Sequence, residues 1–101
     1  MKTELIKLNS KGLPQPRICN ITKHCLYFVT LDKKDVKKVI HLSSLVKTSI
    51  SPGWDSLVCL HTEEGKDIWL IVSEKIEFIA LLKKTKKKLD DKELPMDISS
   101  T

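Results

Sequence analysis

The segment DIWLIVSEKIEFIALLKKTKKKL, residues 67–89, contains the change of hydrophobic period that decides the fold. Residues 68–72 form the apolar, β-branched run that is typical of a strand, which we predict over residues 67–72. From Ser73 onward the apolar residues recur at helical spacing. They form one stripe, which consists of Phe78, Ile79, Leu82 and Leu89. The sequence therefore predicts a strand that is followed directly by an amphipathic helix.

Ser73 is the predicted N-cap of this helix, because a serine side chain can accept a hydrogen bond from an unpaired N–H group of the first turn. Glu74 and Glu77 suit the positive end of the helix dipole, and the lysines of residues 83–88 suit its negative end. These lysines are expected to cover the surface that the apolar stripe leaves exposed. Residues 95–101, which begin with a proline, are predicted to form a polar tail.

Upstream of this segment the hydrophobic pattern has the short period of strands, with turn-forming residues at regular intervals. Pro14 and Pro16 are expected to stay out of a central ladder, because proline has no N–H group to donate. Val46, Thr48 and Ile50 alternate with polar residues, which is the period of a half-buried strand, so Val46 is expected to face the core together with the other two. Gly65 is expected to take a positive φ in a hairpin turn. Six strands are predicted here, over residues 5–8, 17–22, 25–31, 36–42, 45–51 and 56–62.

The order of the elements, seven short strands and then one helix, is more informative than the elements alone. A small sheet that bends toward a barrel leaves an open end, which a terminal helix can plug. This is the architecture of pleckstrin-homology domains, whereas an all-β sandwich would not need the last helix. The predicted fold is mainly β with one C-terminal helix, in which the helix caps a seven-stranded bent sheet or partly open barrel. A chain of 101 residues has room for one domain, which we place at residues 1–94.

The formal net charge is +5, from 18 Lys and Arg against 13 Asp and Glu. This excess favours an anionic partner, such as a phosphoinositide, an anionic bilayer or a nucleic acid. Basic residues bunch within residues 33–38 and 83–88, although each bunch also fits an ordinary solvated surface. No apolar run approaches the roughly 20 residues of a spanning helix, and the N-terminus lacks the pattern of a signal peptide. We therefore expect a cytosolic protein.

The three cysteines are an odd number in a chain without a secretory signal, so we expect reduced and mostly buried thiols instead of a disulfide framework. Cysteine and histidine are also the preferred ligands of zinc. Their spacing argues against such a site, because the paired ligands of structural zinc do not occur. The residues concerned are Cys19, His24, Cys25, His41, Cys59 and His61. We expect neither a metal nor a cofactor.

Several segments resemble the tail homology 1 region of class I (unconventional) myosins. The longest, IHLSSLVKTSISPGWDSLVCLH at residues 40–61, is similar to that family's I-P-L-S-D-I-T-G-I-S-V-S-P and D-S-L-F-V-L-H patterns. SEKIEF at residues 73–78 resembles the start of the family's helix, and KELPMDIS at residues 92–99 resembles its K-E-L-P-V-N-F-S. The resemblance implies a pleckstrin-homology-like tail domain, which attaches an actin-based motor to acidic phospholipids and phosphoinositides.

The resemblance also implies where a lipid headgroup binds. In the family, a lysine on the first strand and an arginine at the start of the second hold the headgroup at the open end of the barrel, and Lys7 and Arg17 match these positions. Lys11 and Lys23 are further candidates near the same rim. The family's loop is more basic than residues 13–16 are here. The alternative is that Lys7 points outward from its strand and that Arg17 is an ordinary surface residue.

Other functions find less support in the residues. The main alternative is a pleckstrin-homology-like protein-interaction module with weak or no lipid binding, which the less basic loop favours. Nucleic-acid binding is disfavoured, because the aromatic residues are not interleaved with arginine. The chain has no glycine-rich phosphate loop and no catalytic context for Ser, His or Cys, so we expect no enzyme. An ATPase, and any contact with actin, would belong to a parent motor.

The expected location is the cytoplasmic side of the plasma membrane or of endomembranes, peripherally bound and within the actin cortex. Trp54, in a Pro-Gly-Trp-Asp turn, would suit a membrane interface if it is exposed, although such a residue more often packs on the edge of a sheet.

Overall fold

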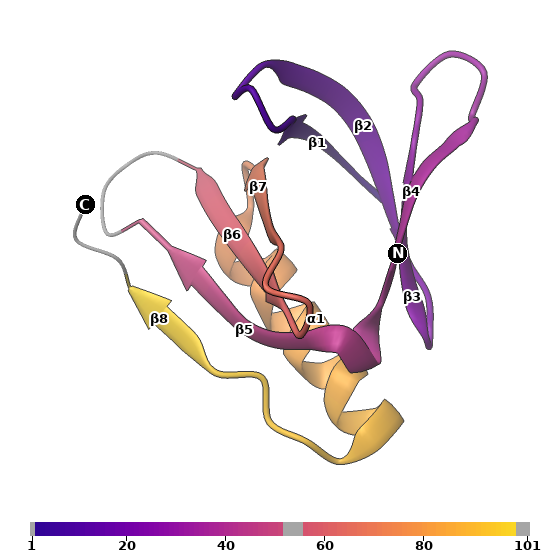
Figure 1. Cartoon of the computed structure of the whole chain (residues 1–101). Coiled ribbons are helices and arrows are strands. Elements are labelled where there is room, and N and C mark those ends of the chain that lie inside the picture. Colours follow the sequence, from indigo (N-terminus) through magenta and orange to yellow (C-terminus); the bar gives the residue numbers. More distant parts are fainter. Residues whose placement is uncertain (1, 52–55, 99–101) are drawn as a thin grey trace.

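The computed structural model describes residues 2–51 and 56–98, which form one eight-stranded sheet and one long helix (Figure 1). The predicted class, mainly β with one C-terminal helix, is confirmed. Trp54 and its turn lie outside the described residues. No helix among the described residues is long and apolar enough to cross a membrane. The elements are β1 (Lys2–Leu8), β2 (Pro14–Ile21), β3 (Cys25–Val29), β4 (Val36–His41), the short 3-10 helix η1 (Leu42–Ser44), β5 (Leu45–Ile50), β6 (Leu57–Thr62), β7 (Asp67–Ile71), α1 (Lys75–Asp90) and β8 (Met96–Ile98).

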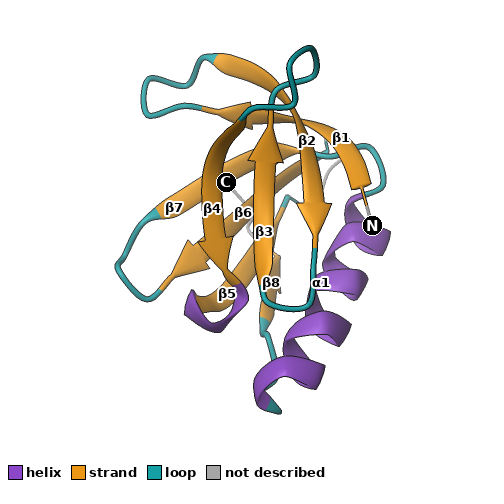
Figure 2. Cartoon of the chain, turned by 90° about the vertical axis from the view of Figure 1, so that its right-hand side faces the viewer, coloured by secondary structure: helices purple, strands orange, loops and turns teal. Residues whose placement is uncertain are grey.

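The strands follow the order β4-β3-β2-β1-β7-β6-β5-β8. Every neighbouring pair is antiparallel except β5 and β8, which run parallel. The sheet bends, so that β2–β4 and β5–β7 lie on opposite sides of the molecule (Figure 1). In the view of Figure 2, helix α1 runs along one side of the sheet, and it contacts η1. Because β4 and β8 stand at the two ends of the order, the sheet is a bent, unclosed barrel, as the sequence predicted, with one additional strand.

Helix α1 covers the barrel with the apolar stripe that the sequence predicted. Phe78, Ile79 and Leu82 are at most 2% exposed. They belong to one core cluster with side chains from the sheet and η1, among them Phe28 and Leu42. Burial of an apolar side chain of this size contributes about 1.5–3 kcal/mol to the stability of the fold.

Strand β2 begins earlier than predicted, at Pro14. Its first residues pair with β1, where Leu8 is opposite Pro14 and Ile6 is opposite Pro16. Strand β3 joins β2 only from Ile18 onward. The section that contains the prolines therefore has a neighbour on one side alone. Proline fits such an edge, because its missing N–H removes no ladder bond there.

The stretch that was predicted to be a polar tail contains the eighth strand. Met96 in β8 lies opposite Thr48 in β5. Leu94, which is 1% exposed, anchors the connection from the helix in the core. The carbonyl oxygen of Pro95 accepts hydrogen bonds from the backbone N–H of Thr48, at 2.9 Å, and from its hydroxyl, at 3.3 Å. Residues 94–98 are therefore held to the sheet.

Two details of α1 differ from the prediction. The helix begins at Lys75 with Glu74 as its N-cap and without a side-chain cap, so the prediction that Ser73 caps it is wrong. Lys86 is 3% exposed, whereas a surface position was expected. Its ammonium group donates to the carbonyl oxygen of Leu42, at 3.0 Å, and to the carboxylate of Asp90, at 2.9 Å. The core therefore contains, where α1 meets η1, a buried lysine ammonium group with two hydrogen-bond acceptors.

The prediction that Val46 faces the core is wrong, because the side chain is 46% exposed. A register shift between Leu45 and Lys47 marks a bulge in the pairing of β5 with β6. One extra residue in a strand reverses the alternation of its side chains. Leu45, Thr48 and Ile50 are therefore the residues of β5 that are buried.

Gly65 in the β6–β7 turn has the predicted positive φ, +78°, and no atom lies within 4 Å of where a Cβ would be. Gly65→Ala should therefore lower the free energy of unfolding through backbone strain alone, by about 1–2 kcal/mol. Gly65→Asn should cost less, because asparagine tolerates this conformation better. Urea denaturation of the three proteins tests this. An unchanged midpoint for Gly65→Ala would contradict the left-handed turn.

Candidate anion-binding site

The turn between β1 and β2 is held in shape by Asn9. Its side-chain oxygen accepts hydrogen bonds from the backbone N–H groups of Lys11 and Leu13, both at 2.9 Å. Gly12 has a φ of +79°, which glycine adopts without strain. The turn joins the end of β1 to the start of β2. Lys7 and Gln15 lie opposite each other on these two strands, close to the turn.

The pleat of β1 places Lys7 on the inner face of the barrel. Thr3 and Leu5 are buried, and side chains at every second position of a strand share one face. Arg17 lies directly opposite Leu5 and belongs to the same face. Lys7 and Arg17 are both half-buried. The alternative, that Lys7 simply points outward, is therefore wrong, and the structure brings the two predicted cations together.

Two further lysines join Lys7. Lys38 on β4 lies opposite the fully buried Phe28 of β3, so it also faces inward. Lys66 lies in the β6–β7 turn. Lys7, Lys38 and Lys66 line a pocket of about 430 Å³, together with Asn9, Ser10 and Trp69. We call this pocket the mouth.

The charges at the mouth are close enough to affect one another. Burial lowers the pKa of Lys7, and the positive charges of Lys38 and Arg17 lower it further. None of these three lysines, nor Arg17, takes part in an ion pair among the described residues. Asp67 also lines the pocket, but its carboxylate oxygen bonds Nδ1 of His61 at 2.8 Å. The mouth is therefore a hollow with a surplus of positive charge, which suits an anion.

The remaining predicted site residues lie elsewhere. Lys11 is exposed in the β1–β2 turn, near the mouth but not among its lining residues. Lys23 lies in the β2–β3 turn, and it lines a different pocket beside α1. Because β2 runs from the mouth to that turn, the expectation that Lys23 is near the same rim is wrong. Whether either lysine binds lipid stays a prediction.

Sequence reasoning missed Lys38 and Lys66 as members of the site. Lys38 was noticed only as part of a basic bunch, and its neighbours on β4, Lys37 and Val39, are exposed. Its inward direction depends on the pairing with Phe28 and on the bend that brings β4 toward β1. The one usable signal was alternation, since the buried Ile40 two residues on shares the face of Lys38.

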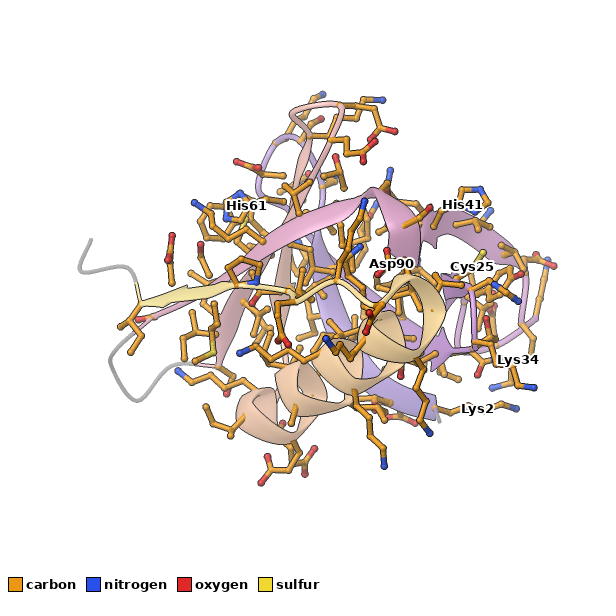
Figure 3. The ribbon with its side chains drawn as sticks, turned by 90° about the horizontal axis from the view of Figure 1, so that it is seen from below. Lys2, Cys25, Lys34, His41, His61 and Asp90 are labelled. Carbon is orange, nitrogen blue, oxygen red and sulfur yellow. The ribbon has the colours of Figure 1, made fainter. Side chains whose placement is uncertain are left out.

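The cysteines and histidines that were weighed as zinc ligands do not gather in one place. All three cysteines are free and buried, as predicted. Sγ of Cys25 lies 3.4 Å from Nδ1 of His41, on the other side of the molecule from His61 (Figure 3). Potential ligand atoms of Cys59, His61 and Asp67 lie within 4.8 Å of one another.

The second group is better described as a hydrogen-bond relay than as a metal centre. His61 bonds Asp67 through Nδ1 and the hydroxyl of Ser49 through Nε2, both at 2.8 Å. Burial, and then the charge of Asp67, raise the pKa of the Cys59 thiol to about 11. A metal would have to displace the proton of this thiol, and the raised pKa makes that displacement less favourable. The expected absence of a metal stays a prediction.

A bent sheet with a C-terminal helix and cations at one end is the architecture of a pleckstrin-homology domain. The solved structures of similar fold include a pleckstrin homology domain (TM-score 0.70, 14% identity, 92% of this chain and 89% of that chain). They also include the PH domain of human oxysterol binding protein-related protein 11 (TM-score 0.71, 14% identity, 90% and 82%). The linker-DH/PH structure of p115-RhoGEF matches as well (TM-score 0.72, 15% identity), where 89% of this chain spans 29% of that one.

A family model described as "Unconventional myosin tail, actin- and lipid-binding" matches residues 1–101, and the chain belongs to this family. The resemblance to myosin tails is thereby confirmed. The description gives the family two kinds of partner, actin and lipid. The fold and the family are those of non-catalytic modules. The comparison with curated proteins gave no match.

Proposed function

We propose that the mouth binds the phosphorylated headgroup of a phosphoinositide and thereby holds the myosin tail on acidic membranes. The observation that supports this most is that Lys7, Arg17 and Lys38 share one inner face and that, among the described residues, no ion pair involves any of them. Lys7 and Lys38 line the mouth itself, whereas Arg17 lies beside it, and the single carboxylate among the lining residues, that of Asp67, is outnumbered by three lysines. A phosphate is the simplest group that would relieve their mutual repulsion. The family's description as lipid-binding supports the same class of ligand.

The cations have different parts in this proposal. Arg17 offers a planar fork of donors, which matches two phosphate oxygens at once, and its position is steadied by a bond of 2.8 Å to the carbonyl oxygen of Pro16. Lys7 and Lys38 act as point charges beside it. Lys11, exposed at the tip of the β1–β2 turn, adds general attraction to an anionic bilayer.

The proposed role in the cell follows from this attachment. The tail lies peripherally on the cytoplasmic face of the plasma membrane or of endomembranes, within the actin cortex. An actin-based motor in the same protein would then be anchored to the membrane through the mouth. The ATPase belongs to that motor, because the fold described here is a non-catalytic module.

Lys7→Ala combined with Arg17→Ala tests the proposal. Each basic residue at an anionic surface contributes about 1 kcal/mol, so the double variant should bind vesicles more weakly by about 2 kcal/mol, or about 30-fold. The measurement is cosedimentation with phosphatidylcholine vesicles that contain phosphoinositide bisphosphate. Vesicles of equal charge made with phosphatidylserine show whether the headgroup or only its charge is recognised.

The control variant is Lys84→Ala with Lys88→Ala, which removes the same charge from α1, away from the mouth. It should bind these vesicles nearly as well as the unmodified chain. Equal binding by the double mouth variant at low salt would contradict the proposal. Vesicle binding should weaken between low and physiological salt, because exposed charges are screened over that range. Peptide docking on an apolar groove, which the alternative of a protein-interaction module predicts, should not weaken in this way.

A further inference from the structure

A second pocket, larger than the mouth, lies between helix α1 and the β2–β3 turn. Its volume is about 680 Å³. Its apolar part comes from Ile21 at the end of β2 and from Leu81 and Leu89 on the helix. Among the described residues, three lysines and no acidic residue also line it. These lysines are Lys23, Lys84 and Lys88. We call this pocket the helix groove.

The lysines of the helix groove differ from their neighbours on the same helix. Lys86 pairs with Asp90, and Lys87 pairs with Asp91 and Glu93. Among the described residues, in contrast, no ion pair involves Lys23, Lys84 or Lys88. Lys84 and Lys88 are four residues apart on a helix, where like charges repel. The three cations thus surround an apolar surface without internal neutralisation.

The helix groove and the mouth lie at opposite ends of β2. Pro14 begins the strand opposite Leu8, which lines the mouth, and Ile21 ends it in the helix groove. Eight residues of strand span about 25 Å. One lipid headgroup therefore cannot occupy both pockets, and we look for a partner of another kind at the helix groove. This choice between membrane and protein as occupant rests on the proposed function of the mouth.

We infer that the helix groove binds an acidic segment of a partner protein, in which carboxylates flank at least one large apolar side chain. The apolar side chain would cover Leu81 and Leu89, which are only partly buried although they pack against the core. The carboxylates would pair with the three unneutralised lysines. The tail would then connect a membrane at one end of its barrel with a protein at the other.

Labelled peptides test the inference. The probes are short helical peptides of Glu, Leu and Trp, with the apolar residues at helical spacing and in several registers. Two matched control sets accompany this acidic apolar set. In the Gln set every Glu is replaced by Gln, which removes the charge. In the Ser set every Leu and Trp is replaced by Ser, which removes the apolar side chains. Fluorescence anisotropy gives the affinity, and amide NMR shifts of the unmodified chain give the location. We expect binding by the acidic apolar set alone, with shifts at Ile21, His24, Leu81 and Leu89.

The decisive variant is Lys84→Glu with Lys88→Glu, which should weaken peptide binding by on the order of tenfold or more, because like charges then face each other. Lys83→Glu with Lys87→Glu makes the same change of charge on neighbouring positions that do not line the pocket, and it should retain most of the affinity. Circular dichroism shows that both variants are folded. Neither should alter vesicle binding, whereas the mouth variant should alter vesicle binding alone.

Several results would overturn the inference. They are an absence of binding by every acidic apolar peptide, equal binding by the Gln set, and equal loss in both charge-reversed variants. Shifts at the helix groove on addition of anionic vesicles would also overturn it, since a lipid would then be the occupant. The proposed function fails separately, if the mouth variant binds phosphoinositide vesicles as well as the unmodified chain does.

Discussion

Phe78→Ala is expected to remove a large part of the free energy of unfolding. The phenyl ring is 1% exposed and lies in the core cluster where α1 meets the sheet. Truncation of a buried phenylalanine removes its transfer free energy and leaves a cavity, which together cost about 3–5 kcal/mol. Domains of this size are stable by only about 5–15 kcal/mol. The loss is therefore a large part of the total, although Ile79 and Leu82 would still hold the helix on the sheet.

Urea denaturation followed by circular dichroism measures the effect. Ile76→Ala is the matched control, because Ile76 is on the same helix but 55% exposed, and it should change the free energy of unfolding by about 0.5 kcal/mol or less. Phe78→Leu should lie between the two, since most of the buried volume is retained. A cost below about 1 kcal/mol for Phe78→Ala would mean that α1 is not needed to close the core.

Lys86→Glu is expected to be about as damaging, for an electrostatic reason. The ammonium group of Lys86 is buried and has two acceptors, the carbonyl oxygen of Leu42 and the carboxylate of Asp90. A glutamate would place a second negative group beside both. A buried charge without a partner costs about 3–5 kcal/mol. Lys87→Glu, one residue further on, changes an exposed ion pair and should cost less than about 1 kcal/mol.

The same contact makes the stability depend on pH. The hydrogen bond from Lys86 holds the pKa of Asp90 below that of an ordinary carboxyl group. Its contribution is complete above the ordinary carboxyl range and is lost as the pH falls through the lowered pKa. Urea midpoints measured from neutral to acidic pH should therefore fall less steeply in Lys86→Met, which lacks the donor. Identical slopes would contradict a stabilising bond to Asp90.

Much of the fold was predictable because period and order are local properties of the chain. The stripe of Phe78, Ile79 and Leu82 defined the helix, and alternation with turn residues defined seven strands. What failed depends on pairing. The bulge that exposes Val46 arises from the register with β6, and the three residues of β8 are too few to show a period. Strand β8 forms because the buried Leu94 holds the chain on the core and because β8 can pair with the outer edge of β5.

The site was predictable only in part, for a similar reason. The resemblance to myosin tails indicated Lys7 and Arg17, and the structure places both on one inner face. Lys38 is distant along the chain, and only the bend of the sheet brings it to Lys7. Lys23 was a further candidate near the same rim, yet it lies at the far end of β2. Which cations converge is decided by the curvature of the sheet and not by spacing.

The repulsion among Lys7, Arg17 and Lys38 lowers the stability of the folded domain, whereas the same three charges favour its attachment to an anionic membrane. Under the proposed function, a neutral side chain of similar length at position 7 would relieve the repulsion and strengthen the folded state. It would also weaken the attraction for an anionic membrane. Proteins often show such trade-offs at sites where function requires unfavourable contacts. Selection for a more heat-resistant tail would therefore have to find its improvements in the core or the helix, while the mouth stays electrostatically unfavourable until a membrane covers it.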